Sequence, residues 1–161
     1  MYDADALLAG NEQALADAID TLSPELYRYA AGILLSSADA ADAVQNAFIA
    51  LWKHRGSVRD PAAVRAYLYR CTYRACVDII RMNRLFLPLP RQDCCPLSEE
   101  MTAALAKLSA MERAIVYERA VTDTPYAELA EHLGMRADNV RKKYERARKK
   151  LAKYLGGNHD R

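Results

Sequence analysis

The chain has 161 residues, of which 52% are hydrophobic and 27% charged, and its formal net charge is +2. This length fits one domain or two small ones, and the alanine- and leucine-rich apolar content is ample for a helical core. No stretch approaches the length of a membrane span, and the N-terminus MYDADALLAG lacks a signal peptide, so we expect a cytoplasmic protein with no membrane insertion.

The small net charge hides a segregation of charge along the chain. Residues 1–50 hold one basic and eight acidic side chains, whereas residues 51–90 hold eight basic and two acidic ones. The alternation repeats, with four basic and eight acidic in 91–135 and ten basic and three acidic in 136–161. Two basic surfaces, one per half, suggest two contacts with a polyanion.

Helical periodicity begins close to the N-terminus. Leu7 belongs to a short amphipathic segment that Gly10 interrupts, and Asn11 is a plausible N-cap for the next helix. A separate helix is expected from about Pro24 to Leu35.

The stretch SADAADAVQNAFIALWKHR predicts another helix, with Ser37 as its cap. Its inner stripe is expected to consist of Ala41, Val44, Phe48 and Leu51. Its other face is polar with few cations and carries Asp39, Asp42, Gln45 and Asn46. The spacing alone predicts only that this face of the helix is exposed to solvent.

A loop is predicted from His54 to Ala63, because Gly56 and Pro61 break the helical pattern. The helix AAVRAYLYRCTYRACVDIIRMNR comes next, with an apolar face of Leu68, Cys71, Ala75, Ile79 and Met82. Another face interleaves cations and rings, namely Arg70, Arg74 and Arg81 with Tyr67, Tyr69 and Tyr73 nearby. This pattern suits single-stranded nucleic acid, whose bases stack on rings while arginine meets phosphates. It equally suits half-buried core tyrosines, and periodicity leaves both interpretations open.

The proline-containing segment LFLPLPRQDCCPLSEE has no helical period and marks a domain boundary. Cys71 and Cys76 fit small buried positions in the preceding helix, and Cys94 and Cys95 fall in this linker. Their spacing matches no common zinc or iron–sulfur signature, so we expect no metal and no cofactor.

The second half ends in a helix-turn-helix pattern. Ser109 and Glu112 form a capping box, and Thr124 with Pro125 predicts a later helix start. An apolar face then comprises Ala127, Leu129, Ala130 and Leu133. Gly134 supplies the turn, and a basic final helix, Ala137 to Leu155, has Val140, Tyr144, Ala147 and Leu151 on its inner face.

No catalytic constellation is visible, so we expect a protein that is not an enzyme. His54, His132 and His159 fall on separate elements, with no nucleophile or paired carboxylates in register. No glycine-rich phosphate loop occurs either.

The order of these motifs resembles the bacterial sigma factors of the extracytoplasmic-function (group IV) family over nearly the whole chain. The resemblance is carried by ADAADAVQNAFIALWK, RAYLYRCTYRACVDIIR, a proline-containing linker, LSAMERAIVY and YAELAEHLGMRADNVRKKYERARKKL. It implies an all-α fold with a sigma-two-like helical bundle (1–85), a flexible linker (86–98), a sigma-four-like helix-turn-helix domain (99–157) and a short tail (158–161).

The resemblance also implies a function and partners. An RNA polymerase sigma factor binds core RNA polymerase, through its clamp and flap, and directs promoter recognition, DNA melting and transcription initiation. Promoter DNA, as duplex and as melted single strand, would be the second partner, and an anti-sigma factor a further possible one.

The resemblance implies three groups of site residues. The family's DxxQxxF pattern and its neighbours place polymerase binding on Asp39, Asp42, Gln45, Asn46 and Phe48. The loop from His54 to Ala63 falls where the family captures a flipped base, and contacts to the minus-ten element fall on His54, Arg55, Arg70, Tyr73, Arg74 and Arg81. Contacts to the minus-thirty-five element in the major groove fall on Asn139, Arg141, Lys142, Glu145, Arg146 and Lys149.

Three positions depart from the family pattern. Arg74 stands where an asparagine is frequent, Asn46 where a glutamate is usual, and Arg136 where a serine or threonine cap is usual.

Two other classes of protein remain as alternatives to a sigma factor. One is a helix-turn-helix repressor with an N-terminal ligand or dimerisation domain, which predicts a dimer and a palindromic operator. The other is a helical protein-binding adaptor without salt-dependent DNA affinity.

Overall fold

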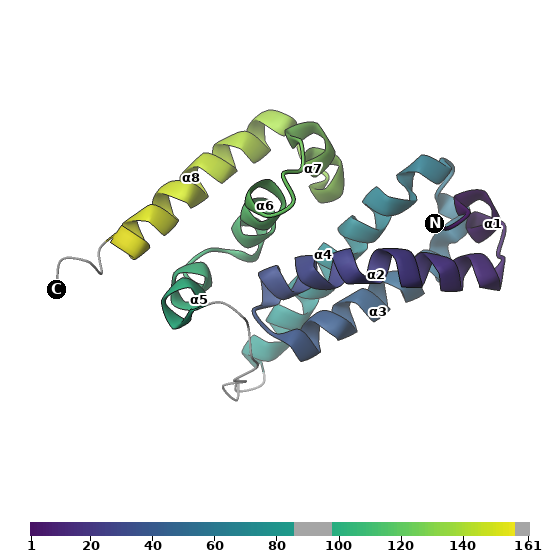
Figure 1. Cartoon of the computed structure of the whole chain (residues 1–161), viewed down its shortest axis with the longest axis horizontal. Coiled ribbons are helices and arrows are strands. Elements are labelled where there is room, and N and C mark those ends of the chain that lie inside the picture. The colour runs from purple at the N-terminus through teal and green to yellow at the C-terminus, as the bar shows by residue number, and fades with distance from the viewer. Residues whose placement is uncertain (86–97, 157–161) are drawn as a thin grey trace.

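A computed structural model describes residues 1–85 and 98–156 of the chain, and within these ranges it contains helices and no strand. Figure 1 shows the first half as a bundle and the second half as a smaller group of helices beside it. The first half contains α1 (Ala4–Leu8), α2 (Glu12–Leu34), α3 (Ser37–His54), the single-turn 3₁₀ helices η1 (Arg55–Ser57) and η2 (Pro61–Ala63), and α4 (Val64–Leu85). The second half contains α5 (Glu99–Ala106), α6 (Ala110–Ala120), α7 (Tyr126–Leu133) and α8 (Ala137–Gly156).

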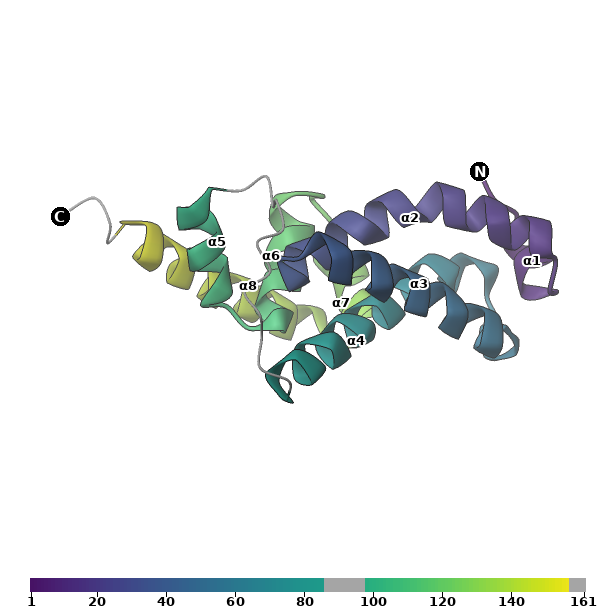
Figure 2. The same ribbon diagram turned by 90° about the horizontal axis from the view of Figure 1, so that it is seen from below.

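Three long helices, α2, α3 and α4, form the bundle of the first half and lie side by side in both views (Figures 1 and 2). Their apolar faces meet in a core that contains Leu26, Leu51 and Leu68, all fully buried. The short α1 closes one end of this bundle with Leu7, which is also fully buried.

The helix predicted to start at Pro24 is instead part of one continuous helix, α2, with Pro24 inside it. The buried residues Ala18, Leu22 and Leu26 keep the helical period across the proline. Pro24 itself is exposed. Water can therefore satisfy the carbonyl of Asp20, which loses its intrahelical donor, and packing of the opposite face outweighs the cost of the proline.

The predicted helix starts are confirmed at some positions and shifted at others. Asn11 caps α2, because its side chain accepts a hydrogen bond from the Ala14 amide at 3.0 Å. The cap of α3 is Ser36 rather than Ser37, with 3.3 Å between the Ser36 hydroxyl and the Asp39 amide. The shift by one residue keeps the same cap chemistry.

In the second half, the capping box of Ser109 and Glu112 is confirmed, with its two hydrogen bonds at 3.1 and 2.9 Å. The prediction that Thr124 caps α7 is wrong. Pro125 occupies the cap position without a side-chain hydrogen bond, and the Thr124 hydroxyl lies 2.8 Å from that of Thr122.

Some positions in the predicted apolar stripes are wrong. On α3, Ala41 is exposed and its place inside is taken by small residues on either side, Ala40 and Ala43. On α4, Met82 is 53% exposed, whereas Leu68 is buried as predicted, and the buried stripe also contains Val64, Tyr69, Thr72 and Cys76. The burial on α4 is shifted because α7 of the second half also packs on it. On α7, Ala127 is exposed, whereas Leu129, Ala130 and Leu133 are buried as predicted.

The helix-turn-helix is formed by α7 and α8. Gly134 between them has φ +64°, a left-handed conformation that a residue with a side chain rarely adopts. Val140 and Ala147 of α8 are fully buried against the rest of the domain.

The two halves are in contact along α2 with α6 and along α4 with α7. A Cβ on Gly32 of α2 would lie 2.8 Å from the Cδ2 of Tyr117 on α6, so this crossing depends on a glycine. We call this interface between the two halves the seam. Tyr29 is fully buried in it, and its ring centroid lies 4.9 Å from that of Tyr69 and 6.2 Å from that of Tyr117. Arg113 strengthens the contact, because its Nε donates to the carbonyl of Ile33 at 2.6 Å.

Predictions for the remaining segments lie outside the described residues. These are the linker up to residue 97, including Cys94 and Cys95, and the tail with His159. Ser98, at the end of the predicted linker, caps α5 by accepting a hydrogen bond from the Met101 amide at 3.2 Å.

Candidate protein and nucleic-acid interfaces

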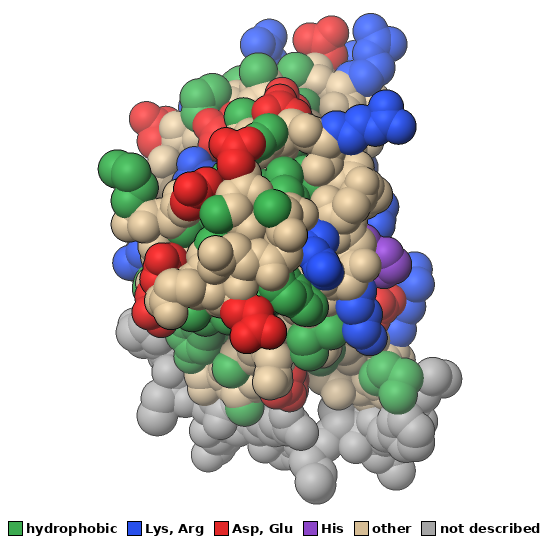
Figure 3. All heavy atoms as spheres, turned by 90° about the vertical axis from the view of Figure 1, so that its right-hand side faces the viewer, with side chains coloured by type: hydrophobic (Ala, Val, Ile, Leu, Met, Phe, Trp, Pro, Cys, Tyr) green, Lys and Arg blue, Asp and Glu red, His purple; other side chains and the backbone are tan. Residues whose placement is uncertain are grey.

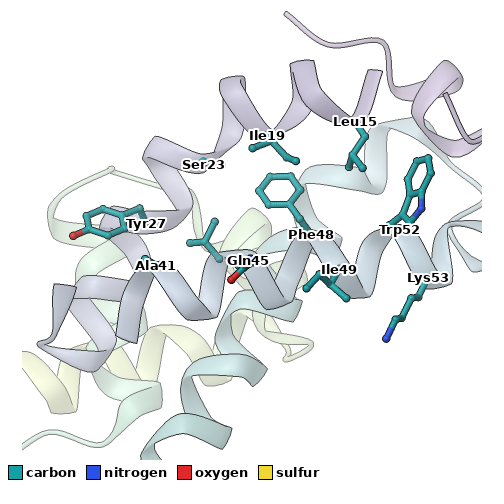
Figure 4. A pocket seen from close by; sticks show the side chains of 11 residues that line it. Leu15, Ile19, Ser23, Tyr27, Ala41, Gln45, Phe48, Ile49, Trp52 and Lys53 are labelled. Carbon is teal, nitrogen blue, oxygen red and sulfur yellow. The ribbon is translucent and has the colours of Figure 1, made fainter. Parts of the chain in front are cut away.

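An open apolar groove of about 630 Å³ runs between α2 and α3. Figure 4 shows Leu15, Ile19 and Tyr27 of α2 on one side and Gln45, Phe48 and Ile49 of α3 on the other. Ile19 and Ile49 are 38% and 45% exposed, which is unusual for large aliphatic side chains. A continuous apolar groove of this kind is typical of a surface that binds another protein.

The structure divides the five residues predicted to bind polymerase. Gln45 and Phe48 line the groove between α2 and α3, and Asp42 is exposed on the same helix. Asn46 and Asp39 instead line a second groove between α3 and α4. Asp39 is buried, and Asn83 of α4 donates a 3.4 Å hydrogen bond to its Oδ2, so Asp39 is not on the exposed polar face where the helical pattern placed it.

The cations of α4 differ in how free they are. Arg74 and Arg81 are exposed, and Arg81 makes a 4.0 Å ion pair with Asp78 one turn away. Arg70 is half-buried, and its Nη2 donates to the carbonyl of Glu131 on α7 at 2.9 Å. Two of the three predicted strand-binding arginines of α4 are therefore exposed to solvent in this arrangement.

The tyrosines of α4 separate into two groups. Tyr69 is 3% exposed, and its ring stacks on that of His132 with centroids 4.2 Å apart and planes within 13°. It packs in the seam, as the core interpretation expected. Tyr67 and Tyr73 are half-buried, and burial raises the pKa of both. Each therefore presents part of a neutral ring at the surface.

The loop between α3 and α4 is confirmed, and it contains the single turns η1 and η2. His54 is exposed, whereas Arg55 stacks over the Trp52 ring at 4.3 Å and donates to the Trp52 carbonyl at 2.5 Å. An open groove of about 620 Å³ lies between this loop and α4. Glu131 of α7 lines its edge, so the second half borders this groove as well.

The outer face of α8 carries its predicted DNA contacts together. Asn139, Arg141, Lys142, Glu145, Arg146 and Lys149 are all exposed, opposite the buried Val140 and Ala147. Figure 3 shows the end of the molecule that carries the N-terminus, where Lys and Arg side chains gather toward one edge and Asp and Glu lie mostly away from it.

Sequence reasoning missed an ionisable pair between α6 and α7. His132 Nδ1 lies 2.6 Å from Glu118 Oε2, and both side chains are almost fully buried. Burial raises the pKa of Glu118, and the hydrogen bond from His132 opposes that rise. Glu118 lies at helical spacing from the buried Ala114 and Ile115, and this was the one signal that it faces inward.

A second missed cluster joins the two halves. The guanidinium of Arg65 on α4 makes a bidentate ion pair with the carboxylate of Glu25 on α2. Its Nε and Nη2 each donate to one carboxylate oxygen at 2.9 Å. It also contacts Glu128 of α7 at 3.2 Å. The hydrogen bond with Glu25 is the main reason that the pKa of Arg65 is raised. In the sequence, this arginine is visible only as part of a basic segment.

The cysteines that the structure describes behave as small apolar residues. Cys76 is buried, and burial raises the pKa of its thiol to about 12, so it is protonated and unreactive at neutral pH. Among the residues in ranges 1–85 and 98–156, no group of three or more potential ligands is placed to hold a metal ion.

Family models match both halves of the chain. Sigma-70 region 2 matches residues 18–85, and Sigma-70 region 4 matches residues 98–151. The ECF RNA polymerase sigma factor SigM of Mycobacterium tuberculosis (strain ATCC 25618 / H37Rv) is 30% identical over 160 residues, covering 94% of this chain and 82% of SigM. The chain belongs to the extracytoplasmic-function (ECF) sigma factors. The sequence resemblance is thereby confirmed, and the repressor alternative is not favoured.

Solved structures show the same fold. CnrH, in complex with the cytosolic domain of CnrY, has a TM-score of 0.70 at 24% identity, covering 96% of this chain and 99% of CnrH. RpoE of Bartonella quintana, in complex with the anti-sigma factor NepR, has a TM-score of 0.70 at 19% identity, covering 91% and 98%. The predicted all-α architecture is confirmed. The two sigma domains and the role in transcription initiation, with core RNA polymerase and promoter DNA, follow from the family models and the relative.

None of the helices in the described ranges is long and apolar enough to cross a membrane.

Proposed function

We propose that this sigma factor divides promoter recognition between its halves. Residues 1–85 would bind core polymerase and hold the melted minus-ten strand, and residues 99–157 would read the minus-thirty-five duplex. The observation that carries this division is that the two predicted sets of DNA-binding cations lie in separate halves. The first set lies on α4, with Arg55 in η1 before it, and the second lies on α8. A major-groove helix suits duplex DNA, and exposed arginines beside tyrosine rings suit a single strand.

The groove between α2 and α3 is our candidate for the polymerase clamp. Exposed apolar side chains supply contact area, and Asp42 supplies a charge beside the groove-lining Gln45. Such an arrangement provides an apolar centre with a polar rim, as in other protein interfaces. The buried Asp39 would then support α3 from within rather than touch the clamp.

Strand binding would require the two halves to separate. Arg70 is engaged by Glu131, and Glu131 also borders the groove beside the loop that the family uses to capture a base. We propose that on polymerase α7 moves away from α4, which exposes both Arg70 and the groove beside the loop. An anti-sigma factor, of the kind bound by RpoE in its structure, would be a partner that binds the contacting halves.

The same proposal places this protein in the cytoplasm, where core polymerase and the chromosome are. It has no catalytic activity of its own and no cofactor, because the chemistry of RNA synthesis belongs to the polymerase that it directs.

Asp42→Arg tests the clamp assignment. The charge reversal is expected to reduce binding to core polymerase at least about tenfold, because a like charge at an interface rim and a lost polar contact together cost more than about 1.4 kcal/mol. Binding is measured by titrating purified core enzyme with labelled protein. Glu100→Arg, an equal reversal at an exposed site on α5, should bind as the unchanged protein does. If Asp42→Arg also binds normally while its helical content is intact, the groove is not the clamp site.

A further inference from the structure

Tyr126, the first residue of α7, lies between two arginines in the helix-turn-helix. The guanidinium carbon of Arg119 lies 4.6 Å from the centre of its ring, and that of Arg141 lies 5.3 Å from it. Both distances are within the range of a cation–π interaction. The arginines come from α6 and α8, so one half-buried ring joins all three helices around the DNA-binding surface.

The ring is itself held in place on two sides. The side chain of Arg119 is 24% exposed and is fixed by a 2.8 Å hydrogen bond from Nη1 to the Thr124 carbonyl and a 3.3 Å contact to Asp123. Tyr144 of α8 packs against the ring edge-on, with centroids 6.2 Å apart. Arg141 therefore packs against a ring whose rotation is restricted, whereas the Arg141 side chain is otherwise exposed.

Arg141 differs in this respect from the other cations expected on the duplex. It lies in the second turn of α8, in the part of a recognition helix that contacts base edges. Among the described residues, Lys142, Arg146 and Lys149 have no ring contact of this kind. A flexible arginine loses much of its side-chain freedom when it binds a base, and a prior restraint removes part of that cost.

We propose that Tyr126 is a positioning residue for sequence recognition: its ring, clamped by Arg119, orients Arg141 toward one base pair of the minus-thirty-five element. Tyr126 does not itself touch DNA in this proposal, which rests on the proposed role of α8. Arg141 then supplies sequence preference, and the unrestrained cations supply affinity that is similar for all sequences.

The test is a double-mutant cycle on the full chain assembled with core polymerase. Holoenzyme binding is measured in competition among promoter duplexes that carry each single base-pair change in the upstream element. Arg141→Ala is expected to lower discrimination at one position by about tenfold. Tyr126→Leu should lower it at the same position by about two- to fivefold, and Tyr126→Phe, which keeps the ring, should change it little.

The decisive result is the combination. In an Arg141→Ala background, Tyr126→Leu should have no further effect on discrimination, because the residue through which it acts is gone. A uniform loss of affinity, a change at another position, or an additive effect would each overturn the proposal. A loss with Tyr126→Phe as well would show that the hydroxyl contacts DNA directly, which also overturns it.

Two controls keep the result interpretable. Tyr154→Leu removes an exposed tyrosine from the same helix as Arg141 and should be neutral. If Tyr126→Leu does not fold, Tyr126→Met, whose flexible side chain fills irregular space, enters the same cycle. Holoenzyme that selects no promoter at all would contradict the proposed role of α8, whereas normal selection with indifferent Tyr126 variants contradicts only the positioning role of Tyr126.

Discussion

His132→Ala is expected to lower the free energy of unfolding of the second half by about 3 kcal/mol or more. Glu118 would then remain almost fully buried without the group that lies 2.6 Å from its carboxylate. Removing one partner of a buried pair typically costs about 3–5 kcal/mol, because the other stays desolvated. The stacking of His132 on Tyr69 across the seam would be lost as well. Urea unfolding followed by circular dichroism measures the change.

Two further results separate this cause from a simple cavity. The double variant Glu118→Met with His132→Leu should recover most of the lost stability, because no buried charge remains. Burial already raises the pKa of Glu118, so in His132→Ala its protonation at lower pH should relieve the penalty. The deficit should therefore shrink as the pH falls from about 7 to about 5. A deficit independent of pH and of Glu118 would show that the pair is not the reason.

Arg70→Ala combined with Arg81→Ala is expected to permit core binding and closed-complex formation but to block promoter opening. Both side chains lie on α4, where the proposed function places the melted strand. Loss of two cations removes phosphate contacts, and each stacked base contributes about 1–3 kcal/mol only if the backbone is held near the rings. Permanganate reactivity of promoter thymines reports opening. On a template with a pre-melted bubble, the double variant should regain part of its transcription activity.

The control for this variant is Arg28→Ala, which removes an exposed arginine from α2 and should open promoters normally. The seam adds a distinction between the two sites. Arg70 also holds Glu131, so its loss alone should loosen the contact between the halves, whereas loss of Arg81 alone should not. Normal opening by the double variant would remove α4 from the melting role and leave Tyr67 and Tyr73 as packing residues.

The sequence was sufficient for the elements that depend on local signals. The capping box at Ser109, the cap at Asn11 and the turn at Gly134 depend on short-range chemistry, and the structure has all three. Pro24 was misleading for a physical reason. The local cost of a proline is fixed, whereas the packing of α2 against α3 and α6 that offsets it is not visible in local sequence.

The seam between the halves is the part that sequence reasoning could not reach. Tyr69 and His132 are 63 positions apart, and their stacking depends on how two domains dock. The same docking buries Tyr69, on the face of α4 for which periodicity left both strand binding and core packing open. Likewise, the restraint of Arg141 by Tyr126 needs three helices in place, and a spacing rule within α8 contains no trace of it.

The division of promoter recognition between α4 and α8 is tested most directly by transcription in vitro. Core RNA polymerase, with and without this protein, transcribes a library of genomic fragments, and the start sites are mapped. We predict new start sites that share two separated promoter elements, one near minus thirty-five and one near minus ten. Arg141→Ala should alter base preference only in the minus-thirty-five element, and Arg74→Ala only in the minus-ten element. Start sites that do not depend on the protein, or a preference in both elements that changes with Arg141 alone, would contradict this division.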